Sequence, residues 1–140
     1  MSGVRCQKVI MTVNSYRDLR VWQKAMDLVL TSYEVARQFP QSELYGLMSQ
    51  IQRAAVSIPA NIAEGHGREH LGDYLHHLSM ANGSLMELET HFLIAGRLGY
   101  LEVEPMNQLL DRTAEVGRML AGLIRSLKNS RPSQNLTPDT

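Results

Sequence analysis

Apolar residues recur at steps of three and four along most of this chain, which is the spacing of an amphipathic α-helix. In the first such segment two apolar seams run side by side: Leu19, Trp22, Met26, Val29, Tyr33 and Ala36 in one, and Val21, Ala25, Leu28, Val35 and Phe39 in the other. A face this wide predicts a helix that buries more than one side. Phe39-Pro40 predicts its end, because the residue before a proline disfavours the α conformation.

A second helix is predicted after this proline. Ser42 is its expected N-cap, and Glu43 is favourable in the first turn. Its apolar seam consists of Leu44, Met48, Ile51, Ala55, Ile58 and Ile62. Pro59 has no N–H to donate, which disturbs the helix there. We expect a kink, because the apolar period continues in phase; the alternative is a break at which Pro59 opens a new helix. Gly65 and Gly67 predict the following turn.

Two further helices follow. The third is expected to run from Leu71 to Leu98 and to stop at Gly99, and the fourth is expected to begin near Pro105. Their seams are Leu71, Tyr74, Leu78, Ala81, Leu85, Leu88, Phe92 and Ala95 in the third, and Met106, Leu109, Thr113, Val116, Leu120, Leu123 and Leu127 in the fourth.

Four long helices joined by short loops predict an all-α fold, an antiparallel up-down-up-down four-helix bundle. We assign residues 16–128 to the bundle, 1–15 to an N-terminal extension and 129–140 to a disordered tail. Cys6 is the single cysteine, which excludes an internal disulfide. No apolar run approaches the ~20 residues that a membrane span needs, so we expect no membrane association and a cytoplasmic protein.

Charge changes the picture little. Fourteen Lys and Arg residues balance fourteen Asp and Glu residues, so the formal net charge is zero, which argues against a strongly electrostatic nucleic-acid binder. A local basic edge is expected on the fourth helix at Arg112, Arg118 and Arg125. Asp111 and Glu115 are expected to interrupt it.

A polar stripe runs along the second helix at steps of three or four: Gln50, Arg53, Ser57, Asn61, Glu64 and Arg68. It lies about 100° around the helix from the apolar seam, which predicts partial burial. An unsatisfied buried polar group costs about 1–3 kcal/mol, so we interpret the stripe as a structural network, with Ser84 and Glu87 of the third helix as partners for Arg53 or Asn61. A binding site is the alternative. Glu87 also precedes His91 by four residues, which predicts a helix-surface pair.

The sequence carries no motif that requires catalysis. Bundles that hold two iron ions need paired Glu-x-x-His motifs, whereas this chain offers only Asp73-x-x-His76. His66 and His70 have the spacing of a metal pair, but the two glycines in that stretch favour a solvated turn. We therefore expect a protein that is not an enzyme and that holds no metal and no cofactor.

Three stretches resemble a known family: "RDLRVWQKAMDL", "FPQSELYGLMSQIQRAAVSIPANIAEGHGR" and "YLHHLSMANGSLMELETHFLIAGRLGYL". The matching positions are Trp22, Tyr45-Gly46-Leu47, Gln50, Arg53-Ala54-Ala55, Ser57-Ile58, Asn61-Ile62-Ala63-Glu64-Gly65, Arg68, Gly83-Ser84 and Glu87. Over about residues 16–128 the chain resembles the bacterial four-helix-bundle proteins labelled S23 ribosomal protein or 23S rRNA intervening-sequence protein. Gln52 stands where that family commonly has an arginine, which removes one positive charge.

The resemblance implies an antiparallel bundle that assembles into a ring, often of five subunits. A more distant relative is the accessory protein of diversity-generating retroelements, a basic ring that binds nucleic acid and a reverse transcriptase. We therefore expect a homo-oligomer, a pentameric ring, that acts as a non-enzymatic adaptor with RNA or an RNA-associated protein as partner. The doubled seam of the first helix independently favours an oligomer. The alternatives are a protein-binding scaffold with no nucleic-acid role and an enzyme that uses the polar stripe.

Overall fold

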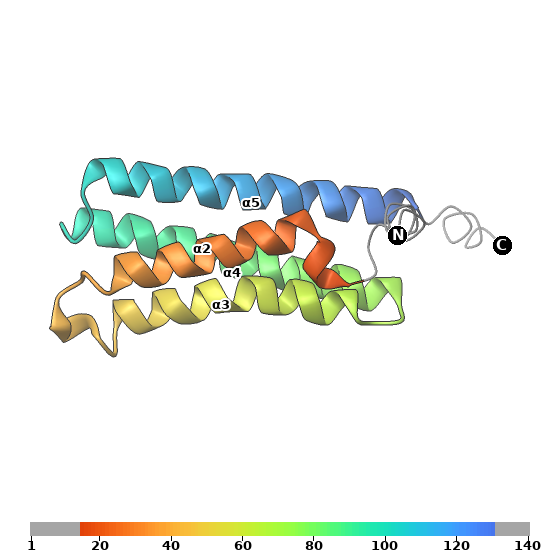
Figure 1. The fold of residues 1–140 in the computed structure, drawn as a ribbon, viewed down its shortest axis with the longest axis horizontal. Coiled ribbons are helices and arrows are strands. Elements are labelled where there is room, and N and C mark those ends of the chain that lie inside the picture. The colour runs from red at the N-terminus through yellow and green to blue at the C-terminus, as the bar shows by residue number, and fades with distance from the viewer. Residues whose placement is uncertain (1–14, 131–140) are drawn as a thin grey trace, which may run out of the picture.

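The computed structural model describes residues 15–130, which form four long α-helices and two short 3-10 turns (Figure 1). In chain order the elements are η1 (Tyr16–Asp18), α2 (Arg20–Ala36), η2 (Gln41–Glu43), α3 (Leu47–His66), α4 (Leu71–Arg97) and α5 (Val103–Asn129). No β-strand occurs in this part of the chain. The expected extension and tail fall on residues 1–14 and 131–140, which lie outside the described residues, apart from the few positions that adjoin them.

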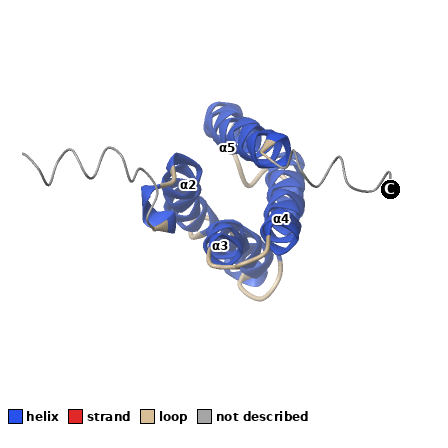
Figure 2. Ribbon diagram, turned by 90° about the vertical axis from the view of Figure 1, so that its right-hand side faces the viewer, coloured by secondary structure: helices blue, strands red, loops and turns tan. Residues whose placement is uncertain are grey.

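Successive helices run in opposite directions along a common axis (Figure 1). Seen along that axis, α2, α3, α4 and α5 follow one another around the section (Figure 2). Each helix packs against the helices before and after it in this order, so α2 and α4 lie diagonally across the bundle. The predicted all-α four-helix bundle is thus confirmed.

The core contains apolar residues from all four helices. Its largest fully buried apolar side chains are Leu28, Ile51, Ile58, Ile62, Leu78, Leu85, Leu88, Phe92, Leu109, Val116 and Leu120. All of them belong to the predicted seams. Burying a side chain of this size contributes ~1.5–3 kcal/mol, and this burial stabilises helices that would be marginal in isolation.

The two apolar seams of α2 enter this core to different extents. Val21, Ala25 and Leu28 are buried. In the neighbouring seam Ala36 is also buried, whereas Trp22, Val29 and Tyr33 are half-buried and Met26 is exposed. The Tyr16 ring packs edge-on against Trp22, with ring centroids 5.3 Å apart, and covers one end of this seam. The rest of the seam is incompletely covered by the described part of the chain.

The start of α3 differs from the prediction. Ser42 is exposed in η2 and Leu44 precedes the helix, which begins only at Leu47. Glu43 Oε1 accepts a hydrogen bond from the backbone N–H of Leu47 at 2.9 Å, and the Tyr100 hydroxyl donates to Glu43 Oε2 at 2.9 Å. The prediction of Ser42 as N-cap is wrong, because a carboxylate held by the α4–α5 connection caps the helix instead.

The same contacts set the acidity of both side chains. The Leu47 N–H, and after it the Tyr100 hydroxyl, lower the pKa of Glu43. The hydrogen bond to Glu43 in turn raises the pKa of Tyr100. A Cβ added at Gly46 would lie 2.8 Å from Glu43 Oε1, so a larger residue there would displace the capping carboxylate. This end of the bundle is therefore tied together by one carboxylate.

Pro59 does not interrupt α3, which runs from Leu47 to His66, so the alternative of a break is wrong. The prediction that Gly65 marks the turn is wrong, because Gly65 is buried in the last turn of the helix. A Cβ added at Gly65 would lie 2.7 Å from Cβ of His77, so this glycine lets α3 and α4 approach closely. Gly99 has a φ of 83° and follows the end of α4, as a glycine helix stop should.

Candidate functional site

A hydrogen-bonded cluster joins α3 to α4 at the middle of the polar stripe. The hydroxyl oxygens of Ser57 and Ser84 lie 2.8 Å apart. The Asn61 amide donates to the Ser57 hydroxyl at 3.0 Å and to the Ser57 backbone carbonyl at 2.9 Å. Ser57 follows Ala55 by two residues, and the Ala55 carbonyl loses its helical donor at Pro59. All three side chains of the cluster are half-buried, so their polar groups depend on one another for partners.

The stripe continues as an ion-paired cluster near the end of α3. Glu64 Oε2 lies 3.0 Å from Arg68 Nη2 and 3.5 Å from His77 Nε2. His77 is buried, and its Nδ1 lies 3.0 Å from the Asp73 carbonyl oxygen. The side chains of Glu64 and Arg68 are about half exposed, and ion pairs of that kind contribute at most about 1 kcal/mol to stability.

The other stripe residues stand apart from these clusters. The expected pairing of Glu87 with Arg53 or Asn61 is wrong. Glu87 instead pairs with Nε2 of His91, with the two atoms 3.4 Å apart. The expectation of a surface pair is wrong in one respect, because His91 is buried, with only 8% of its surface exposed. Gln50 and Arg53 are exposed and form no side-chain hydrogen bond or ion pair within residues 15–130.

The chemistry of the Ser57–Asn61–Ser84 cluster suits structural cohesion. Within residues 15–130 no imidazole or carboxylate is hydrogen-bonded to either hydroxyl, so no described group activates these serines as nucleophiles. His66 packs edge-on against the Tyr74 ring, with centroids 5.8 Å apart. Within the described residues, no three His, Cys, Asp or Glu side chains gather as metal ligands. Among the described helices, none combines the length and apolar character needed to cross a membrane.

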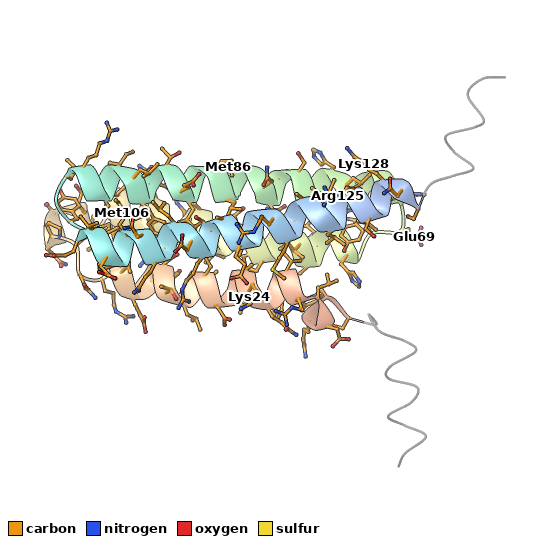
Figure 3. All side chains as sticks on the ribbon, turned by 90° about the horizontal axis from the view of Figure 1, so that it is seen from above. Lys24, Glu69, Met86, Met106, Arg125 and Lys128 are labelled. Carbon is orange, nitrogen blue, oxygen red and sulfur yellow. The ribbon has the colours of Figure 1, made fainter. Side chains whose placement is uncertain are left out.

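A second candidate surface is a groove between α4 and α5, which we call the α4–α5 groove. Small residues of α5 help to form this hollow, namely Ala114, Gly117 and Ala121. Its apolar lining includes Leu85, Met86 and Ile124. Its polar lining consists of Asn82, Glu89, Arg118, Arg125, Lys128 and Asn129, with Thr113 beneath them. Figure 3 shows Arg125 and Lys128 in the C-terminal part of α5.

The predicted basic edge of α5 is divided between two faces of the helix. Arg118 and Arg125 line the α4–α5 groove, whereas Arg112 donates to the Thr31 hydroxyl of α2 at 3.2 Å. Six residues rotate a helix by about 240°, so Arg112 and Arg118 cannot share one side. Lys128, which the prediction omits, completes the basic side of the groove.

The acidic residues expected to interrupt this edge lie outside the groove. Glu115 forms an ion pair with Lys24 of α2, with Nζ and Oε2 3.7 Å apart, and Asp111 is not among the lining residues. The charged residues that line the groove are therefore Arg118, Arg125, Lys128 and Glu89. Their charges sum to +2, on a chain whose formal net charge is zero. A positively charged groove with apolar lining concentrates its field and attracts anions.

Comparison with known proteins gives the family. Among solved structures, the chain is similar to a protein of unknown function from the S23 ribosomal protein family of Bacteroides thetaiotaomicron, with 21% identity and a TM-score of 0.70. The alignment covers 75% of this chain and 95% of that one, and at this identity it shows the shared fold. No curated protein matches the chain. The profile described as "23S rRNA-intervening sequence protein" matches residues 17–122, and the chain therefore belongs to the 23S rRNA-intervening sequence protein family.

Proposed function

We propose that this protein is a non-enzymatic adaptor that assembles with copies of itself and binds RNA. The observation that carries the proposal is the incompletely covered apolar side of α2, on which Met26 and Leu30 are 37% and 63% exposed. Contiguous exposed apolar surface on a soluble bundle is typical of a protein–protein interface. A ring of five subunits is the assembly that the resemblance to S23-type bundles supports.

The α4–α5 groove supports RNA as the partner. Arg118, Arg125 and Lys128 lie seven and then three residues apart, a spread of about 15 Å along α5 that could neutralise several phosphates of one strand. Asn82 and Asn129 add amide groups that can donate to or accept from base edges and 2′-hydroxyls. The family description, which names an rRNA intervening sequence, agrees with this assignment. An RNA partner would place the protein in the cytoplasm.

Two other functions compete with this proposal. A protein-binding scaffold with no nucleic-acid role is favoured by the zero net charge, since the positive field is confined to one groove. An enzyme that uses the polar stripe has no such support. The hydroxyls of Ser57 and Ser84 are hydrogen-bonded to each other, the Ser57 hydroxyl accepts from the Asn61 amide, and no base in the described part of the chain is hydrogen-bonded to them. We therefore assign the stripe a structural role.

Filter binding of a structured RNA hairpin over a salt series tests the RNA assignment. If all three cations of one groove contact phosphates, log K should fall with log[salt] with a slope of about −2 to −3. The double variant Arg118→Gln with Arg125→Gln should bind more weakly, and its slope should shrink by about 1.5.

The matched control is Arg17→Gln with Arg20→Gln, which removes the same charge from exposed positions on η1 and α2. It should retain the wild-type slope. Equal weakening by both double variants would show that net charge, and not the groove, governs binding. A wild-type protein that retains no hairpin even at low salt would leave the protein-binding scaffold as the function.

A further inference from the structure

One end of the α4–α5 groove is a hollow that gathers most of its positive charge. This part of the groove, which we call the basic pocket, is lined by Asn82, Ala121, Ile124, Arg125, Lys128 and Asn129. Its volume is about 400 Å³, within the range of sites that bind small molecules. Arg125 and Lys128 are three residues apart on α5, so their Cβ atoms are about 5–6 Å from each other. Two cations and two amides, from two helices, thus line one hollow.

The charge of the groove changes sign away from the basic pocket. Leu85 Cδ2 lies 3.3 Å from a Cβ added at Gly117, so α4 and α5 are level at these two residues. Arg118 lies at this level, about 10 Å along α5 from Arg125. Glu89 is four residues further along α4, and because the helices are antiparallel this direction leads away from the basic pocket. The order along the groove is therefore basic pocket, Arg118 and then Glu89.

This order leaves only a short track for phosphates. The cations from Arg118 to Lys128 span about 15 Å of α5, and Glu89 bounds this track at one end. Figure 3 shows Lys128 and the exposed Glu69 at the same end of the bundle, beyond the other limit of the track. A long strand would bring further phosphates toward both carboxylates, which repel them. A strand that ends within the groove avoids one of these repulsions.

The donors of the basic pocket suit a terminal phosphate better than an internal one. An internal phosphodiester carries a single negative charge and two free oxygens. A terminal phosphomonoester carries a charge of about −1.5 to −2 near pH 7 and three acceptor oxygens. Arg125 and Lys128 supply two positive charges, and Asn82 and Asn129 supply amide N–H groups. The charge and the number of donors therefore correspond to the terminal group.

We propose that the basic pocket binds the terminal phosphomonoester of an RNA strand, and that the neighbouring phosphate of the same strand meets Arg118. This inference rests on the proposed RNA binding and names the part of the RNA that the groove recognises. Ala121 and Ile124 provide apolar surface for the terminal ribose. A 5′-phosphate and a 3′-phosphate share this chemistry, and the experiment distinguishes them.

Fluorescence anisotropy with three versions of one RNA hairpin tests the proposal. The hairpin has short single-stranded segments at both ends and carries a 5′-phosphate, a 3′-phosphate or hydroxyls alone. At about 0.1 M salt, one phosphorylated hairpin should bind about tenfold more tightly than the hydroxyl form, because the charged donors gain an additional anionic partner. The position of the preferred phosphate identifies the strand end that the pocket accepts.

Single substitutions separate the basic pocket from the rest of the groove. Lys128→Gln should reduce the tenfold preference to about threefold or less, and so should Asn82→Ala, which leaves the charge of the protein unchanged. Arg118→Gln is the matched control, because it removes one cation outside the basic pocket. It should weaken binding of the phosphorylated and hydroxyl hairpins by the same factor and keep the preference. All three side chains are exposed, so the variants should fold, and circular dichroism checks this.

The possible outcomes distinguish this inference from the proposed function. Equal affinity for all three hairpins, with the expected salt dependence, would show that the terminal-phosphate site is wrong while RNA binding stands. A preference that Arg118→Gln reduces as much as Lys128→Gln would also overturn the site, because the selectivity would then follow the total charge of the groove. A protein that retains none of the hairpins at low salt overturns both proposals.

Discussion

Replacing Gly65 by alanine should destabilise the bundle through one contact between α3 and α4. The added Cβ would lie 2.7 Å from Cβ of His77, 3.1 Å from Cδ1 of Tyr74 and 3.3 Å from the Tyr74 carbonyl oxygen. Ordinary van der Waals contact begins at 3.4 Å, so the His77 Cβ must retreat by about 0.7 Å. That atom is attached directly to the backbone of α4, and no side-chain rotation can move it away.

The expected cost follows from this geometry. Forcing an extra carbon into a packed contact costs about 1–3 kcal/mol, whereas exchanging a helical glycine for alanine gains at most about 1 kcal/mol. Gly65→Ala should therefore lower the free energy of unfolding by about 1–2 kcal/mol. Urea titration followed by circular dichroism measures this difference, at one fixed protein concentration because self-assembly adds to the apparent stability.

Gly122→Ala is the matched control, since Gly122 lies within α5 and the nearest atom to an added Cβ is the flexible Arg125 Nη2 at 3.9 Å. This variant should gain about 0.5–1 kcal/mol. The same chemical change thus has opposite signs at the two sites. If Gly65→Ala were as stable as Gly122→Ala, the close approach of α3 and α4 would not explain the glycine.

Three further outcomes are expected. Asn61→Ala should lower the urea midpoint, by about 1 kcal/mol in free energy, because the Ser57 hydroxyl and carbonyl lose a donor; an unchanged midpoint would favour the binding interpretation of the stripe. Ser32→Ala should raise the melting temperature, because Ser32 Oγ is buried with no hydrogen-bond partner within the described residues, and a lower value would contradict this. The pKa of Glu43 is lowered on folding, so its carboxylate stabilises the fold above the unfolded pKa, and this contribution is lost as pH falls through the folded pKa, below about 4.5. Glu43→Gln should therefore lose less melting temperature than the wild type between about pH 6 and pH 3, and parallel profiles would refute the cap.

Hydrophobic periodicity predicts the helices well, because burial of the apolar seams is the main contribution that orders each helix. It also predicts that α2 has more apolar surface than one bundle can bury. It fails at Ser42, where the composition suggests a hydroxyl cap. The actual cap, Glu43, is held by Tyr100, 57 residues away, and no local pattern reveals that contact. Gly65 is misread for a similar reason, since its role depends on His77 of the next helix.

The polar residues are predicted less completely than the core. Steps of three and four place Ser57 and Asn61 on one face, and antiparallel packing suggests Ser84 as a partner. Which atoms meet depends on the register of α3 against α4, and periodicity does not specify it. The positions of two other residues, relative to the basic edge of α5, follow from a helical projection of the sequence. Seen that way, Arg112 falls outside the basic edge and Lys128 falls within it.

The mass of the wild-type protein in solution tests the central claim, self-assembly, most directly. Size-exclusion chromatography with light scattering at micromolar concentration and about 0.15 M salt should give a multiple of the 15.8 kDa chain mass. The ring of five predicts about 79 kDa, five times 15.8 kDa. A single species of 15.8 kDa at these concentrations would contradict the account, because the apolar side of α2 would then be exposed to water in the native protein.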